Sequence, residues 1–239
     1  MQPQSLFITG TDTGVGKTMV TALLALRLQA SGIDVGVMKP FASGCRRENG
    51  ELISEDAEWL KAISGVDDDL TLINPVRFEE PLAPVAAARR AGRSTQDLMD
   101  EALRAYRVLQ RQHECVLVEG IGGLLVPIRE APGPEPMFQT CADFAEALGL
   151  PVLVVARRTL GTINHSALTC RVKLCAPAHF AGLIFCDAQP VAPEDVAAQT
   201  GPAIIEEMTR LQCWGVVPYL QDQSRQALAE AARQCLEQP

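Results

Sequence analysis

The segment ITGTDTGVGKTMV, residues 8–20, joins an apolar run to a stretch with helical character. Glycines, a lysine and a threonine between a buried strand and a helix direct successive backbone N–H groups and the positive helix end toward one anion. The strict pattern for such a loop has a glycine where this chain has Thr11, but Gly10 is adjacent and GVGKT forms the tightest part of the turn. The segment therefore predicts a phosphate-binding loop (P-loop). The alternative is a glycine-rich turn with a solvated lysine.

The residue types of this loop predict its contacts with a nucleotide. Gly14 and Gly16 allow a phosphate close to the backbone. Lys17 would reach the β- and γ-phosphates, and the hydroxyl group of Thr18 would be a ligand of Mg²⁺. The nucleotide-binding residues predicted from the loop are Gly14, Val15, Gly16, Lys17, Thr18 and Met19.

Apolar runs recur along the chain and alternate with stretches of helical character. The runs are 5–9, 33–40, 115–120, 151–156, 181–186 and 214–218, and helices are expected near 17–30, 55–63, 95–112 and 140–148. The runs are nearly continuous in Val, Ile and Leu, which is typical of parallel strands covered on both faces. This order predicts an α/β fold with a doubly wound, mostly parallel sheet, helices on both faces and one P-loop NTPase-type domain over 1–239. Residues 43–50 and 129–136 are expected to be loops.

Charge and cysteine content exclude several classes of protein. The net charge of −8 and the pI near 5.0 argue against sequence-independent binding to nucleic acid, which needs a basic surface. The eight cysteines include no C-x-x-C pair, so zinc-ribbon and thioredoxin-like sites find no support. No signal peptide and no apolar run of about 18 residues is evident. The sequence thus predicts a cytoplasmic protein with free thiols and no membrane partner.

Three charged residues near strand ends are candidates for the chemistry, because ligands of such sheets bind at the carboxyl ends of the strands. Lys39 ends the run 33–40. If that strand lies beside the first, its ammonium group shares a crevice with Lys17; otherwise Lys39 is an ordinary exposed lysine. Glu119 ends the run 115–120, where many P-loop proteins place an acid near the metal, although it could simply face water. Asp56 follows Ser54, so helix capping alone explains an acid there.

The histidines predict no catalytic role. His165 lies in a helix-like stretch without a serine or cysteine nucleophile signature, and His113 and His179 are isolated.

Six segments together resemble the dethiobiotin synthetase family, the ATP-dependent ring-closing ligases of biotin biosynthesis. They are GTDTGVGKT (10–18), KPFASG (39–44), SEDA (54–57), NPVRFEEPLAP (74–84), EGIGG (119–123) and LGTINHSALT (160–169). The resemblance implies carboxylation of 7,8-diaminononanoate by CO₂ to a carbamate. ATP then phosphorylates the carbamate, and the second amine closes the ring with release of phosphate.

The resemblance also implies roles for individual residues. Lys17 and Lys39 would be catalytic, and Thr18, Asp56 and Glu119 would hold Mg²⁺. Thr13 and Ser43 would bind the carbamate, and Pro84 would flank the same pocket. Further nucleotide contacts would come from Asp56, Glu119, Gly120, Ile121, Gly122, Cys186, Asp187, Pro218, Tyr219 and Leu220.

In the family, the segment around LGTINH comes from the neighbouring subunit. This implies a homodimer in which Leu160, Gly161, Thr162 and Asn164 contact the diamino acid bound to the partner.

Two positions depart from the family pattern. Some members have an acid where this chain has Gly14, and better-studied members have an asparagine that binds adenine where this chain has Cys186. A thiol cannot donate and accept as an amide does, so the nucleotide preference is open.

Three alternatives stay open. A partition-type switch ATPase usually has an extra lysine at the start of the loop, and none precedes Lys17. An amidotransferase-linked ligase acting on a corrin ring needs a glutaminase domain, for which 239 residues leave no room. The third is a nucleotide-binding relative that has lost the reaction.

Overall fold

A computed structural model describes residues 4–131 and 137–236 of the chain. Its centre is a six-stranded sheet with the order β12-β11-β10-β1-β7-β2, in which every neighbouring pair is parallel. The strands are β1 (Leu6–Gly10), β2 (Val35–Met38), β7 (Cys115–Glu119), β10 (Val152–Ala156), β11 (Phe180–Cys186) and β12 (Cys213–Val217). All six predicted strands are present, which confirms the parallel α/β sheet.

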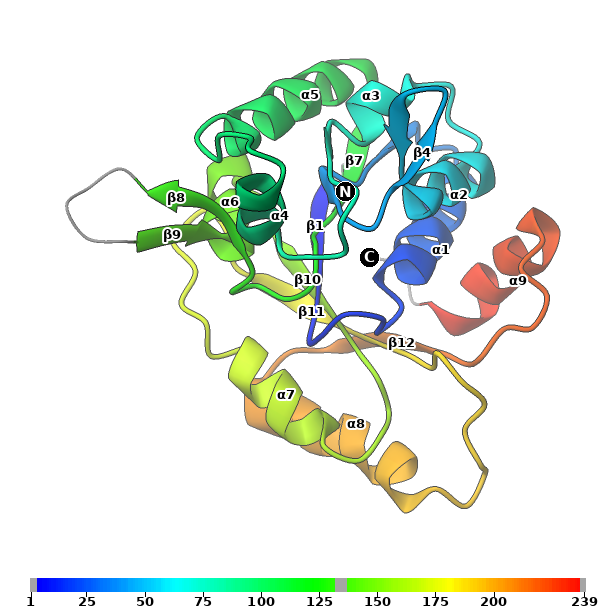
Figure 1. Ribbon diagram of the computed structural model, residues 1–239. Coiled ribbons are helices and arrows are strands. Elements are labelled where there is room, and N and C mark those ends of the chain that lie inside the picture. Colours follow the sequence, from blue (N-terminus) through cyan, green and yellow to red (C-terminus); the bar gives the residue numbers. More distant parts are fainter. Residues whose placement is uncertain (1–3, 132–136, 237–239) are drawn as a thin grey trace.

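Helices cover both faces of this sheet (Figure 1). The first face carries α1 (Lys17–Gln29), α2 (Glu55–Ser64) and α9 (Arg225–Cys235). The second face carries α4 (Pro84–Arg90), α5 (Leu98–Gln112), α6 (Cys141–Leu148), α7 (Thr162–Thr169) and α8 (Val196–Thr209). The short α3 (Leu70–Ile73) contacts β2 at the sheet edge. The fold is therefore the predicted doubly wound one.

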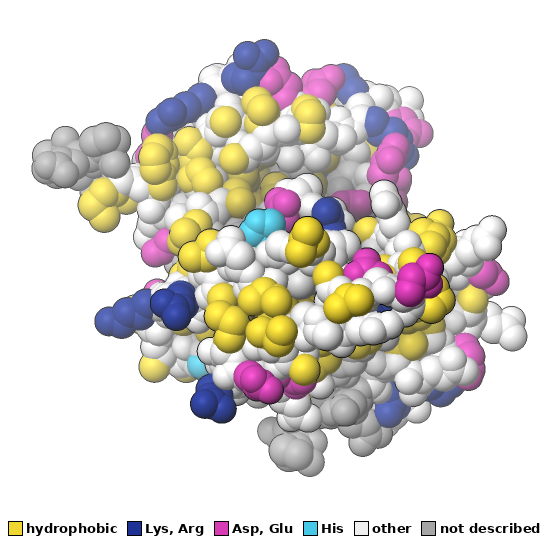
Figure 2. Space-filling view, turned by 90° about the horizontal axis from the view of Figure 1, so that it is seen from below, with side chains coloured by type: hydrophobic (Ala, Val, Ile, Leu, Met, Phe, Trp, Pro, Cys, Tyr) yellow, Lys and Arg dark blue, Asp and Glu magenta, His cyan; other side chains and the backbone are white. Residues whose placement is uncertain are grey.

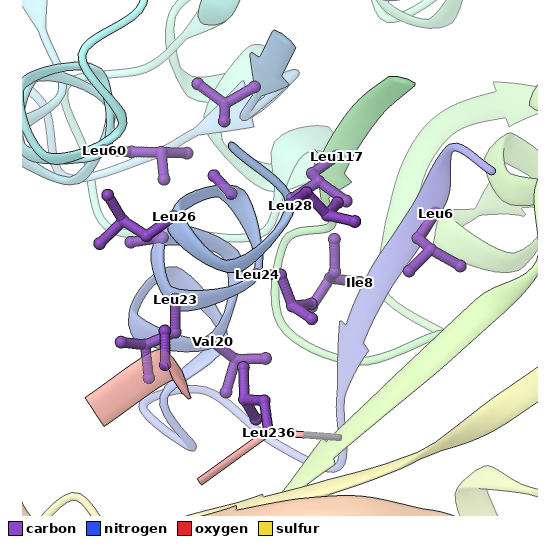
Figure 3. Close-up of a cluster of buried hydrophobic side chains, with 14 of the residues drawn as sticks. Leu6, Ile8, Val20, Leu23, Leu24, Leu26, Leu28, Leu60, Leu117 and Leu236 are labelled. Carbon is purple, nitrogen blue, oxygen red and sulfur yellow. The ribbon is translucent and has the colours of Figure 1, made fainter. Parts of the chain in front are cut away.

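The continuous apolar runs follow from this layering, because successive side chains of a strand point to opposite faces. In β1, Leu6 and Ile8 belong to the core cluster around α1, which Figure 3 shows, whereas Phe7 belongs to the cluster under α5 and α6. All three side chains are at most 4% exposed. A strand buried on both faces has no solvent-facing side, so its sequence does not alternate between apolar and polar residues.

Two of the expected loops overlap short antiparallel hairpins. Strand β4 (Arg46–Glu48), inside 43–50, pairs with β5 (Glu51–Ile53), and β8 (Pro127–Ala131), which overlaps 129–136, pairs with β9 (Met137–Thr140). The loop prediction is therefore wrong for Arg46–Glu48 and for residues 129–131, while residues 132–136 lie outside the described chain. The dipeptide Asn49-Gly50, with φ of 49° and 87°, forms the turn of the first hairpin and was its sequence signal.

The strand order differs from the arrangement considered for Lys39. Strand β2 lies beside β7 and not beside β1, so the end of β7, with Glu119, lies between the end of β2 and the end of β1, from which the phosphate-binding loop leads to Lys17. A further short pair, β3 (Phe41–Ala42) with β6 (Val76–Arg77), continues the chain beyond β2.

Candidate active site

The predicted phosphate-binding loop connects β1 to α1, as its sequence requires (Figure 1). Gly14 and Gly16 have φ of 69° and 95°, backbone conformations that a side chain rarely tolerates. No side chain caps the N-terminus of α1, and its first turn carries no acid. The free N–H groups and the helix dipole at this end therefore favour an anion.

Lys17 is held beside this loop. It is 7% exposed, and its Nζ donates to the backbone oxygen of Asp12 at 3.1 Å. Burial lowers the pKa of Lys17, the charge of Lys39 lowers it further, and Glu119 opposes both.

Glu119 joins the two lysine-bearing regions. Its side chain is 1% exposed, and its Oε1 accepts from Thr18 Oγ1 at 2.8 Å and from Lys39 Nζ at 2.6 Å. Its other oxygen, Oε2, is buried without a hydrogen-bond partner among the described residues. Thus Lys39 does reach the crevice, by spanning the end of β7.

Lys39 lies between two carboxylates. Besides Glu119, its Nζ lies 3.1 Å from Oδ2 of Asp56, whose side chain is 62% exposed. Burial disfavours the charged amine, but Glu119 and Asp56 outweigh burial and raise the pKa of Lys39. Ser54 caps α2 by accepting from Ala57 N, as expected, and Asp56 in the first turn contacts Lys39 in addition.

These groups line one cavity of about 590 Å³ at the carboxyl ends of β1, β7 and β2. The predicted residues that line it are Thr13, Gly14, Gly16, Lys17, Thr18, Lys39, Ser43, Asp56, Glu119, Gly120, Ile121 and Gly122. Val15 points into the core instead and is 1% exposed. In the segment EEPLAP, Pro81, Leu82 and Ala83 line the cavity, whereas Pro84 is buried at the start of α4.

A smaller cavity of about 80 Å³ lies on the other side of Gly16. The predicted base-contacting residues Cys186, Asp187, Pro218, Tyr219 and Leu220 line it together with Met19. Ala188 and Gln223 also line it and were not predicted. The sequence had no signal for Gln223, which precedes α9 in a polar stretch.

Two side chains of this smaller cavity have their polar atoms directed elsewhere. Cys186 Sγ lies against the phosphate loop, since a Cβ placed on Gly16 would be 2.4 Å from it. Burial raises the pKa of the Cys186 thiol to about 12, so it stays protonated. Both carboxylate oxygens of Asp187 accept from Arg158.

The segment 160–164 does not line either cavity. Gly161 precedes α7, Thr162 is buried, and Leu160 is 92% exposed. Exposed apolar side chains continue from this segment over α7 and α8, and Figure 2 shows hydrophobic side chains gathered on the face seen from below. They include Leu160, Leu168, Val196, Ile204 and Met208, which we call the α7–α8 apolar surface.

Two polar residues next to the large cavity were not predicted. Asn74 donates to the backbone oxygen of Lys39, and Arg157 donates to that of Thr13 at 3.0 Å. Both contacts join segments far apart in the chain, which no local pattern reveals.

No helix among the described residues is long and apolar enough to cross a bilayer.

Comparison with known proteins places the chain in a family. The family model described as an AAA domain matches residues 4–227. The solved structure of a ParA family ATPase from Chlorobium tepidum TLS has a TM-score of 0.51 at 12% identity, covering 98% of this chain and 92% of its own. A signal recognition particle receptor FtsY from Elizabethkingia anophelis, in complex with GDP, also has a TM-score of 0.51 at 12% identity. The match covers 97% of this chain and 64% of the FtsY chain. At these identities the structural likeness concerns the fold alone.

Curated relatives share much more of the sequence. The ATP-dependent dethiobiotin synthetase BioD of Thermodesulfovibrio yellowstonii is 37% identical over 95% of this chain and 93% of its own length. The protein of the same name from Anaeromyxobacter dehalogenans (strain 2CP-C) is 41% identical over 95% of each. On this similarity over nearly the whole chain, the protein belongs to the ATP-dependent dethiobiotin synthetase family.

Proposed function

We propose that this chain catalyses the ATP- and Mg²⁺-dependent carboxylation and ring closure of 7,8-diaminononanoate with CO₂ to dethiobiotin. The observation that carries the proposal is the meeting of Lys17, Lys39 and Glu119 at one cavity beside the phosphate-binding loop. Family membership supports the same reaction.

The reaction needs three bond changes on the substrate. One amine adds to CO₂ and loses a proton, forming a carbamate. A carbamate oxygen then attacks the γ-phosphorus of ATP and displaces ADP. The second amine finally attacks the carbamate carbon, loses its proton and expels phosphate, which closes the cyclic urea. None of these steps requires a covalent bond to the protein.

Lys17 and Lys39 would offset the repulsion between the two anions that must react. Carbamate and γ-phosphate are both anions, and fixed positive charge inside a cavity offsets their repulsion. Lys17 would hold the β- and γ-phosphates from the loop, and Lys39 would hold the carbamate at the end of β2. Thr13 and Ser43, which line the same cavity, would donate hydrogen bonds to the carbamate.

The residues present fit a magnesium ion. Thr18, Asp56 and Glu119 offer one hydroxyl and two carboxylates, oxygen ligands that Mg²⁺ prefers together with water and phosphate oxygens. Glu119 Oε2 is buried and unpartnered among the described residues, and the ammonium group of Lys39 already lies between Asp56 and Glu119. When bound, Mg²⁺ would neutralise charge on the phosphates.

The α7–α8 apolar surface supports a homodimer with shared sites. Exposed apolar side chains gathered on one face often mark an interface. Leu160, Gly161 and Asn164 lie away from the cavity of their own chain and would line the diamino acid site of a partner related by a twofold axis. Thr162 is buried and donates to Arg157 O at 2.6 Å, so it would hold this segment in place.

The smaller cavity would hold the base of the nucleotide. Because the Cys186 thiol faces Gly16 and Asp187 is paired with Arg158, base contacts there would come mainly from Pro218, Tyr219 and Leu220. Such contacts discriminate weakly between bases, so we expect other nucleoside triphosphates to support turnover.

The test is phosphate release by the purified protein with Mg²⁺, bicarbonate and each nucleoside triphosphate, with and without the diamine. Mass spectrometry of the same samples detects dethiobiotin. We expect release that depends on the diamine and yields the cyclic urea. Hydrolysis independent of the diamine, with no urea, would instead indicate a switch ATPase.

A further inference from the structure

The backbone of Lys39 makes no strand-pairing hydrogen bonds with the central sheet. Strand β2 is the edge of the sheet and pairs with β7 only as far as Met38. Pro40 follows Lys39 and has no N–H group to donate. The position of the Lys39 backbone therefore depends on contacts from outside the sheet.

Those contacts come from the end of helix α3. The N–H of Lys39 donates to Ile73 O at 2.8 Å, and the side-chain Nδ2 of Asn74 donates to Lys39 O at 2.6 Å. One step further, Val76 N donates to Pro40 O at 3.1 Å. Segment 73–76 thus supplies the hydrogen bonds that a neighbouring strand would make, directly after Met38, where β2 stops pairing with β7.

Asn74 uses only its donor in this arrangement. The residue is fully buried, and its Oδ1 has no hydrogen-bond partner among the described residues. With the amide turned over, Oδ1 would face the carbonyl oxygen of Lys39, and two acceptors would repel each other. The contact fixes the orientation of the amide.

We propose that Asn74 is a positioning residue for Lys39, which it holds through the Lys39 carbonyl group so that Nζ reaches Glu119 and Asp56. This inference rests on the proposed function, in which Lys39 holds the carbamate. A side chain as long as lysine reaches a fixed point only if its own backbone is fixed. A displacement of about 1 Å in a reacting group costs roughly 100-fold in rate.

The donor role makes a prediction that a steric role does not. Asn74→Leu keeps the approximate shape of the side chain but cannot donate a hydrogen bond, whereas Asn74→Ala removes both the shape and the donor. We expect kcat to fall about 10- to 100-fold in both variants, with nucleotide affinity unchanged and Asn74→Leu about as impaired as Asn74→Ala. A steric role would leave Asn74→Leu close to the wild type.

Ser64→Ala is the matched control for lost stability. Ser64 is also fully buried, and its Oγ donates to Leu60 O at 2.7 Å, but it lies on α2 away from the cavity. If the fall in kcat of both Asn74 variants is no larger than that of Ser64→Ala at a matched loss of thermal stability, the inference is wrong.

A spectroscopic measurement reads the contact itself. Lys39-Pro40 is the only Lys-Pro pair in the sequence, so ¹³C-carbonyl lysine with ¹⁵N-proline labels a single peptide bond. Loss of the donor in Asn74→Ala should move that carbonyl resonance upfield in a carbon-detected correlation, while Ser64→Ala should leave it in place. An unmoved resonance in Asn74→Ala would overturn the inference. A wild-type protein that makes no dethiobiotin would instead refute the proposed function. The carbonyl resonance would still show whether Asn74 donates to Lys39, because that measurement does not depend on turnover.

Discussion

Strand β2 has a charged cluster at each end, and the two clusters differ in how completely their polar atoms are paired. At its start, the ring nitrogens of His113 contact Asp34 Oδ1 at 2.8 Å and Asp68 Oδ2 at 3.0 Å. At its end, Lys39 contacts Glu119 and Asp56, but Glu119 Oε2 is left without a partner among the described residues.

The difference separates a structural role from a chemical one. Buried polar groups are nearly always hydrogen-bonded, and Glu119, unlike Asn74 with its unpaired Oδ1, lines the cavity, where a bound ion or substrate would be the partner of Oε2. The His113 cluster joins α5, β2 and the loop before α3, and neither ring nitrogen is unpaired. We infer that charge at the Lys39 end serves catalysis and that charge at the His113 end serves stability.

The largest expected difference in kcat is between two variants, one with a lysine replaced at the Lys39 end of β2 and one with a lysine replaced beside the His113 cluster. Lys39→Met should lower kcat by about 10²–10³, the loss typical for one fixed group that stabilises charge in the transition state. Lys61→Met is the control, because Lys61 Nζ donates to Asp68 O at 2.6 Å beside the His113 cluster. Steady-state dethiobiotin formation measures both. Equal losses in the two variants would remove the distinction between the ends.

Metal affinity tests the role of the charges around Lys39 without depending on turnover. The ammonium group of Lys39 occupies the space between Asp56 and Glu119, so Lys39→Met should tighten Mn²⁺ binding, by about 10-fold for one charge at this range. Lys39→Arg keeps the charge and should bind Mn²⁺ like the wild type. Electron paramagnetic resonance of free Mn²⁺ measures the affinity. Weaker binding in Lys39→Met would contradict the assignment of these carboxylates.

The His113 end should respond to pH and not to substrate. Burial disfavours the imidazolium, but the bonds to Asp34 and Asp68 outweigh it and raise the pKa of His113. Because the folded pKa exceeds the unfolded value, the stabilisation is complete below about pH 6.5 and is lost as pH rises through the folded value. Glu114, which accepts from Asp34 N, and Lys61 are the other charged groups nearby.

We therefore expect His113→Gln to lower Tm at pH 6 by about 2–4 °C, the shift for about 1 kcal/mol in a chain of this size. The difference from the wild type should shrink toward pH 9, and kcat should not change. Thermal melts across this range test it. A difference that grows with pH would show that His113 stabilises the fold as the neutral ring.

Much of the fold and of the phosphate site follows from local sequence. The glycines around Lys17 define a loop whose backbone conformation few other residues allow, and continuous Val and Ile runs define buried parallel strands. Hence the loop, the six strands and the residues at their ends could be predicted before any contact was known.

Strand order and long-range contacts could not be predicted. Nothing local says that β7 inserts between β1 and β2, so the condition under which Lys39 was expected to share the crevice with Lys17 is not met. The side chain of Lys39 nevertheless reaches the crevice at the end of β7. His113 is isolated in the sequence and meets Asp34 and Asp68 only after folding. Asn74 likewise reaches a residue 35 positions away.

The central claim, that phosphate leaves from a phosphorylated carbamate, has a direct isotopic test. A single turnover with [¹⁸O]CO₂, ATP, Mg²⁺ and the diamine is quenched before CO₂ exchanges oxygen with water, and the phosphate is analysed by mass spectrometry. The carbamate oxygen that attacks the γ-phosphorus leaves with it, so each phosphate should carry one ¹⁸O. Unlabelled phosphate would mean that water attacked the nucleotide, and that this cavity hydrolyses ATP without joining it to ring closure.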